Sequence, residues 1–183
     1  MPIASRNHRN TRIVFGCAET PIEKSKCLKI LTCSNYKGRQ TAKFDVGVAP
    51  SGLVTHISQA YGGRASDKLI VNDSGILDKL IYNDAVMTDK GFKIEQECLL
   101  RNLILHRPPF VYQKKQMMRA EALKCAEIAR ARVHVERVIQ RLRDFQFLCD
   151  PIPWEFLPFL DILIIAAAME NLGPPVLNVD KFM

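Results

Sequence analysis

The sequence predicts an α/β domain in which helices flank a mixed sheet. Three observations support this prediction: β-branched, alternating segments come first, short apolar segments then alternate with helical ones, and a long helical pattern covers residues 120–145. The 183 residues, 48% hydrophobic and 25% charged, suffice for one domain with a substantial core. This composition excludes disorder as the main state of the chain.

The first half of the chain predicts three strands. Residues 12–18 form the first, and residues 41–50 and 53–63 form the next two. The Pro-Ser-Gly segment at 50–52 between the last two is typical of a hairpin turn. We therefore expect these strands to form one antiparallel meander.

Short helices and strands alternate in the next part. Ser66 is a suitable N-cap for a helix over 66–81, which Gly75 is expected to break. The elements that follow are a buried strand over 84–92 opening into a loop, a helix over 94–102, and a strand over 103–110 that Pro108 and Pro109 end.

Two helices complete the predicted domain. In the helix over 120–145, apolar residues recur at three- and four-residue spacing and define a core-facing stripe: Ile128, Ala131, Val135, Val138 and Leu142. The last helix, about 155–171, contains an apolar run at 156–169 that is shorter than the roughly 20 residues needed to span a bilayer. We expect it to be buried. The predicted domain is 12–172, between a disordered tail (1–11) and a C-terminal tail (173–183).

The cysteines indicate reduced thiols and do not predict zinc. The six cysteines form no Cys-x-x-Cys pair, and His8, His56 and His106 have no second metal ligand at a useful spacing in the sequence. The first twelve residues are polar and basic, unlike a signal peptide. We therefore expect an intracellular protein.

Two acidic residues are candidates for a catalytic site. Asp89 follows a buried strand and precedes a glycine, a position suited to a cleft, although an Asp that only starts a turn has the same pattern. Glu136 lies at the border of the apolar stripe, half-buried and in need of a partner. Arg132, four residues earlier, is the simple partner. If the two acids meet, their oxygens suit Mg²⁺ or Mn²⁺.

A basic surface is the second candidate feature. The net charge is +7, and residues 101–143 hold eleven Lys and Arg against three Asp and Glu. Such a surface fits the phosphates of DNA or is simply a solvated helix face. We expect His134 to be a polar surface residue beside these cations. The candidate DNA-binding residues are Lys114, Lys115, Arg130, Arg137 and Arg141.

Four motifs, in order, resemble the DDE superfamily endonuclease domain of PIF/Harbinger-like, transposase-derived nucleases, also found in proteins with THAP zinc fingers. They are SNYK, GGRASD, TDKGF and RVHVERVIQRL, and the resemblance covers about residues 12–172. It implies an RNase H-like fold in which three acids hold two divalent cations for cleavage or transfer at a DNA phosphate. The second acid of the family falls on Asp89 and the third on Glu136. Asp67 matches a family feature near the cleft that lies outside this triad.

The chain departs from the family pattern at the first acid. The family typically reads Asp-Cys-Thr-Glu on its first strand, whereas this chain reads Gly-Cys-Ala-Glu at 16–19. Gly16 therefore stands where the first catalytic aspartate is expected. Glu19 is a poor substitute, because residues 16 and 19 point to opposite faces of a regular strand.

We therefore expect a nuclear, metal-binding nuclease domain with impaired cleavage. Two alternatives stay open: a non-enzymatic module that binds DNA or a protein partner, and an active endonuclease that recruits Glu19 or Asp67. The first predicted strand begins about ten residues into the chain, so we expect non-specific DNA binding by this chain alone, with a separate DNA-binding partner protein for target choice. No membrane association is expected.

Overall fold

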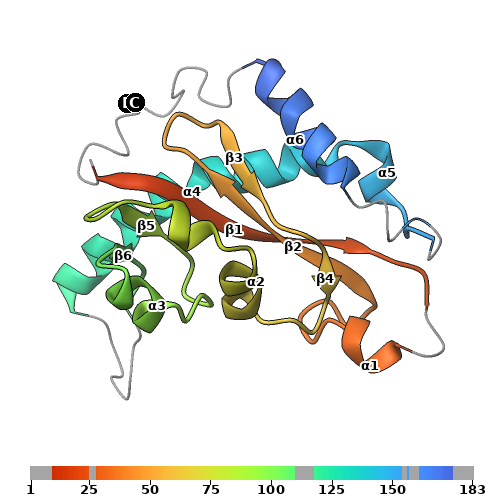
Figure 1. The fold of residues 1–183 in the computed structure, drawn as a ribbon, viewed down its shortest axis with the longest axis horizontal. Coiled ribbons are helices and arrows are strands. Elements are labelled where there is room, and N and C mark those ends of the chain that lie inside the picture. The colour runs from red at the N-terminus through yellow and green to blue at the C-terminus, as the bar shows by residue number, and fades with distance from the viewer. Residues whose placement is uncertain (1–9, 25–27, 110–117, 154–155, 157–160, 175–183) are drawn as a thin grey trace.

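A six-stranded mixed sheet forms the centre of the molecule (Figure 1). The computed structural model describes residues 10–24, 28–109, 118–153, 156 and 161–174. Within them the strand order is β3-β2-β1-β5-β6, and the short β4 pairs with β2 beside β3. The predicted mixed α/β sheet flanked by helices is confirmed.

The central strand is β1 (Thr11–Pro21), which pairs on both sides. It runs antiparallel to β2 (Thr41–Val48) and parallel to β5 (Ala85–Met87). β2 pairs antiparallel with β3 (Val54–Ile57), so the predicted three-strand meander is confirmed. The remaining strands are β4 (Tyr61–Gly62), antiparallel to β2, and β6 (Ile104–His106), parallel to β5.

Helices cover both faces of the sheet. Figure 1 shows α4 (Arg119–Arg143) crossing behind the strands, with α2 (Asp67–Asp73) and α3 (Glu95–Leu100) in front. One hydrophobic cluster joins β1 and β2 to α4, α5 (Gln146–Cys149) and α6 (Ile162–Leu172). A second cluster joins β1 and β5 to α2, α3 and the 3-10 helix η2 (Ile76–Lys79).

Because successive side chains of β1 point to opposite faces of the sheet, its residues are divided between the two hydrophobic clusters. Val14 and Ala18 belong to the cluster with α4, whereas Phe15 is in the cluster with α2 and α3, and Cys17 packs against that cluster. Gly16 lies on the α4 face, since its nearest neighbours there are α4 side chains. The two faces of this one strand therefore meet different helices.

Local signals placed most elements correctly. The Ser66 hydroxyl accepts a hydrogen bond from the backbone N–H of Leu69 at 3.2 Å and caps α2. Gly75 has a φ of 62°, a left-handed conformation that ends the helical run before η2. The α4 stripe is buried throughout. Two four-residue helices, α1 (Lys29–Thr32) and α5, were not predicted, and the strand expected over 53–63 is divided into β3 and β4.

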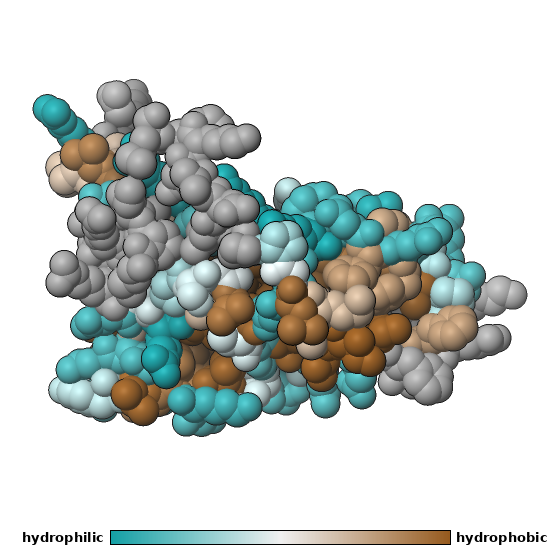
Figure 2. Space-filling model, turned by 90° about the horizontal axis from the view of Figure 1, so that it is seen from above, coloured by the Kyte–Doolittle hydropathy of each residue, from teal (hydrophilic) through white to brown (hydrophobic). Residues whose placement is uncertain are grey.

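The prediction of a buried last helix is wrong for the part of it that the structure describes. On α6, Leu163, Ala166 and Ala167 face the core, but the other side of the helix is exposed. Figure 2, which looks down on this side of the molecule, shows a patch of hydrophobic residues; Ile164, Ile165, Met169 and Leu172 of α6 are all more than half exposed. The helix rests on β3 and α4 by one face only, because both elements lie on the same side of it. Among the described helices, none has both the length and the apolar character needed to cross a membrane.

Candidate active site

Asp89 lies just beyond the carboxyl end of β5, in the loop where the sequence predicts it. Its side chain is 56% exposed, and Oδ1 accepts a hydrogen bond from the backbone N–H of Lys90 at 2.6 Å. The same oxygen lies 3.3 Å from Nη1 of Arg132 on α4. The carboxylate is thus held at the edge where β5 meets α4.

Glu136 lies one helical turn beyond Arg132. Its Oε1 accepts a hydrogen bond from Nη2 of Arg132 at 3.1 Å, and its side chain is 61% exposed, more than the half-buried position expected. The guanidinium of Arg132 therefore bridges the two predicted acids, Asp89 and Glu136. The structure brings them together, but through an arginine. Their roles as catalytic and metal-binding residues stay predictions.

Gly16 lies directly against α4, at the position where the family pattern expects an acid. A β-carbon built on Gly16 would lie 2.7 Å from Cδ1 of Ile139 and 3.0 Å from Cγ2 of Val135, both on α4. Real β-carbons are not found at the first of these distances, so the helix side chains would have to shift. The space next to Gly16 is occupied by the packing of α4 on the sheet.

These observations test whether the site fits a pair of divalent cations. Two-metal phosphoryl chemistry needs several carboxylates that can turn their oxygens toward the ions. Here only Asp89 and Glu136 are present among the described residues of this site, both already bound to the Arg132 guanidinium, and Gly16 supplies no ligand. The residues present do not fit a two-metal centre.

The two acids weighed as substitutes lie on the other side of the sheet. Glu19 alternates with Gly16 on β1 and accepts a hydrogen bond from the Thr41 hydroxyl at 2.9 Å. Asp67, at the start of α2, pairs with Lys43 at 2.6 Å. Asp67 lies close to Gly91 in the loop that carries Asp89, but no interaction among the described residues joins Glu19 or Asp67 to Asp89 or Glu136.

The basic residues of α4 divide into those that face solvent and those that bind other elements. Arg130 is exposed and Arg137 is partly exposed. Arg141 instead donates to Glu170 Oε1 at 2.8 Å and to the carbonyl oxygen of Pro174 at 2.7 Å, which ties α4 to the end of α6. Lys114 and Lys115 lie outside the described residues.

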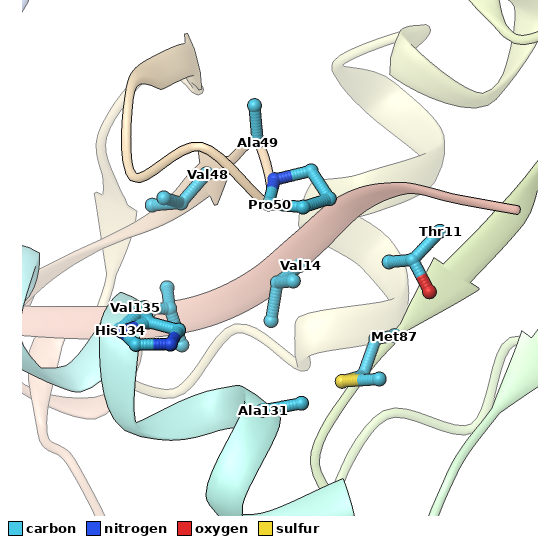
Figure 3. A pocket seen from close by; sticks show the side chains of 9 residues that line it. All are labelled: Thr11, Val14, Val48, Ala49, Pro50, Met87, Ala131, His134 and Val135. Carbon is cyan, nitrogen blue, oxygen red and sulfur yellow. The ribbon is translucent and has the colours of Figure 1, made fainter. Parts of the chain in front are cut away.

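The expectation that His134 is a surface residue is wrong, because it is only 6% exposed. Figure 3 shows its ring on α4 next to Val135, with Val14 of β1 and Met87 of β5 across a small cavity. His134 follows Ala131 by three residues, so it continues the apolar stripe. It packs between the helix and the sheet instead of facing DNA.

Sequence reasoning missed one charged residue of unusual burial, Asp45 on β2. It is 0% exposed and lies directly opposite Cys17 in the β1–β2 pairing. Burial, and then the charge of Asp67, raise its pKa to about 8. Its signal in the sequence is an acid in the middle of the apolar segment KFDVGV.

The sequence of the chain also matches a model of a known protein family. The model described as DDE superfamily endonuclease matches residues 15–171, well over half of the chain. A search of curated proteins finds no match. The six-stranded mixed sheet flanked by helices agrees with the RNase H-like fold of a DDE nuclease. The match spans β1 with Gly16, the loop with Asp89 and the helix with Glu136, and on this basis the chain belongs to the DDE superfamily endonucleases.

Proposed function

We propose that this chain is a transposase-derived DDE nuclease domain of the PIF/Harbinger-like type that binds DNA and cleaves it poorly. The observation that carries the proposal is that Gly16, on the α4 face of β1, offers no side chain to a metal ion at the position of the first acid. A site with glycine at this position has lost one of its three carboxylate ligands.

The ion pairs of Arg132 support the same conclusion. DDE superfamily endonucleases use divalent metals. In this chain a Mg²⁺ or Mn²⁺ ion at Asp89 and Glu136 would compete with a guanidinium that already neutralises part of their charge. We therefore expect weak divalent-ion binding at these two residues. The loss of one directly coordinating group costs a rate factor of roughly 10³ or more.

The charge of the chain supports DNA binding. The formal net charge is +7, and Arg130 and Arg137 lie two helical turns apart on one side of α4, Arg130 exposed and Arg137 partly exposed. Glu136 and Arg137 line a shallow hollow together with Ala129, Arg132, Val133 and Gln140, and Arg130 lies outside this lining, two helical turns before Arg137. Arginines on an exposed face contact phosphates independently of base sequence, so binding to duplex DNA is expected to be non-specific and weakened by salt. Such an activity would be exercised in the nucleus.

A plasmid-nicking assay with Mn²⁺ tests the impairment. We expect the wild-type protein to nick supercoiled plasmid no faster than the Asp89→Ala variant. Strong wild-type cleavage that Asp89→Ala abolishes would overturn the proposal, because Asp89 would then act without an acid at position 16. If cleavage were strong in both proteins, a contaminating nuclease would be indicated, and the comparison is repeated on protein purified by a further column.

Salt-dependent DNA binding tests the second part. The double variant Arg130→Ala/Arg137→Ala should bind duplex DNA more weakly. It should also lower the slope of log K against log salt by up to about 0.9 for each phosphate that is no longer neutralised. The matched control removes two exposed cations elsewhere, Lys29→Ala/Arg64→Ala. Equal weakening in both double variants would show that net charge matters and that this face of α4 does not.

A further inference from the structure

Three potential ligands converge on the face of the sheet opposite α4. Cys17 comes from β1, Asp45 from β2 and Asp67 from the start of α2. The Cys17 sulfur and one carboxylate oxygen from each aspartate lie within 4.8 Å of one another. Gly16 and Cys17 are consecutive on β1 and point to opposite faces, so Cys17 lies on the other side of the sheet from α4 and Glu136.

Asp45 is the residue that needs a ligand. It is 0% exposed, and neither carboxylate oxygen has a hydrogen-bond partner among the residues that the structure describes. Its backbone N–H donates to the Ser58 hydroxyl at 2.9 Å, so the main chain is satisfied while the side chain is not. A buried carboxylate without a donor is costly unless a proton or a cation neutralises it.

The ammonium group of Lys43, near Asp45, forms its ion pair with Asp67 and not with Asp45. The Lys43 ammonium lies 2.6 Å from Oδ1 of Asp67 and 3.1 Å from the carbonyl oxygen of Ala65. The nearby Glu19 accepts from the Thr41 hydroxyl. Neither group gives Asp45 a direct partner.

We propose that Cys17, Asp45 and Asp67 form a binding site for a borderline-soft divalent cation of the zinc class. One thiolate and two carboxylates suit Zn²⁺, whereas Mg²⁺ avoids sulfur. The charges also balance: three anionic ligands, the Lys43 ammonium and one divalent cation sum to zero. The spacing of the cysteines did not predict such a site because its three ligands come from three separate elements.

Binding at this site joins several parts of the fold. The ion links β1 and β2 to the N-terminus of α2. A β-carbon on Gly91 would lie 3.3 Å from the second carboxylate oxygen of Asp67, so the loop that carries Asp89 packs directly on one of the ligands. The site reaches the surface in part, since the Asp67 side chain is 20% exposed and Cys17 is partly exposed. The site would stabilise the domain whether or not the nuclease chemistry survives.

Cobalt(II) tests the proposal because a thiolate ligand gives Co²⁺ a near-ultraviolet charge-transfer band. We expect the reduced wild-type protein to show this band on titration with Co²⁺, and Zn²⁺ to displace it. Cys17→Ser should abolish the band, and Asp45→Asn should weaken metal binding at least tenfold. Asp45→Asn is isosteric with a protonated aspartate, so it keeps the test decisive should Cys17→Ser fail to fold.

Two controls separate this site from other thiols and acids. Cys33→Ser removes another partly exposed free cysteine and should keep the band. Asp89→Ala removes a predicted catalytic acid and should also keep it, so that failure of the proposed nuclease site does not affect the result. The proposal is overturned if the wild-type protein shows no band or if the band survives in Cys17→Ser. It is also overturned if the band keeps its full strength in Asp45→Asn. Asp45 would then be a buried neutral acid.

Discussion

Gly16 and Ile139 define how closely α4 approaches the sheet: a β-carbon on Gly16 would come within 2.7 Å of Cδ1 of Ile139. The glycine therefore has a packing role in this chain, beyond the absence of an aspartate. Ile139 is 3% exposed and Val135 is fully buried, and the atom that a β-carbon on Gly16 would meet first is the end of the Ile139 side chain.

Replacement of Gly16 should destabilise the fold without restoring cleavage. Gly16→Ala should lower the free energy of unfolding by about 1 kcal/mol or less, because the closest contact is the movable end of the Ile139 side chain, and Gly16→Asp by more, because it also buries a carboxylate. Urea denaturation measures both. Ile139→Val removes the contacting Cδ1, so Gly16→Ala should cost less in that background; equal costs in the two backgrounds would contradict the contact.

Removal of the bridging cation should free the two acids. Arg132→Gln deletes the charge between Asp89 and Glu136 and should raise the affinity for Mn²⁺, measured by titration of the free ion by electron paramagnetic resonance. Stability should change by less than about 1 kcal/mol, because both acids are largely exposed. Arg130→Gln removes an equal charge from the same helix and should leave Mn²⁺ binding unchanged. Identical Mn²⁺ affinities in wild type and Arg132→Gln would show that the arginine does not restrict the acids.

Arg141 should matter for stability more than for DNA. Its bonds to Glu170 and to the Pro174 carbonyl hold α6 against α4, and the Glu170 side chain is only 12% exposed. Arg141→Ala should lower the free energy of unfolding by about 1 kcal/mol, and Glu170→Ala by a similar amount. Arg130→Ala is the control and should have almost no effect on urea denaturation. A loss of DNA affinity in Arg141→Ala at unchanged stability would instead return this residue to the DNA-binding surface.

His56 should make the fold sensitive to acid. Burial, with a smaller effect of Lys79, lowers its pKa to about 4, and its ring meets the Phe15 ring edge-to-face at 6.4 Å between centroids. Below its unfolded pKa of about 6.5 the unfolded chain takes up a proton that the folded chain does not, so the contribution of His56 to stability falls as the pH drops from about 6.5 to 4. The raised pKa of Asp45 acts in the opposite direction, so the effect of His56 is measured as a difference from wild type.

The pH dependence of thermal unfolding checks this expectation. His56→Phe should flatten the curve between pH 6.5 and 4 relative to wild type. His106→Gln serves as the control: because the prediction attributes the acid sensitivity to His56, this variant should keep the wild-type curve. An unchanged slope in His56→Phe would place the acid sensitivity in another group.

The sequence predicted well those helices that carry several local signals, such as a cap or a repeated apolar spacing. The seven-residue helix α2, with its Ser66 cap, and the 25-residue helix α4 carry repeated local signals that agree with their tertiary packing. The four-residue helices α1 and α5 contain too few residues for a period to appear. The exposed face of α6 was missed because its sequence is apolar on all sides, and only tertiary contacts select the buried side.

The sequence predicted which residues form the candidate site but not all of the contacts between them. Asp89 and Glu136 do lie near each other, and the pairing of Glu136 with Arg132 follows from their four-residue spacing. That the same arginine reaches Asp89 depends on how β5 docks on α4, which no local pattern encodes. The same holds for Arg141, whose partner Glu170 lies 29 residues away in sequence, and for the approach of Cys17 and Asp67 to Asp45.

The fit of Ile139 against Gly16 also bears on the reversibility of mutation. Codons for aspartate and glycine differ at a single base, so exchange of one residue for the other is a short genetic step in either direction. Once Ile139 packs on the glycine, the backward step requires the end of the Ile139 side chain to move. The packing therefore opposes the return to aspartate in a way that it does not oppose the step to glycine.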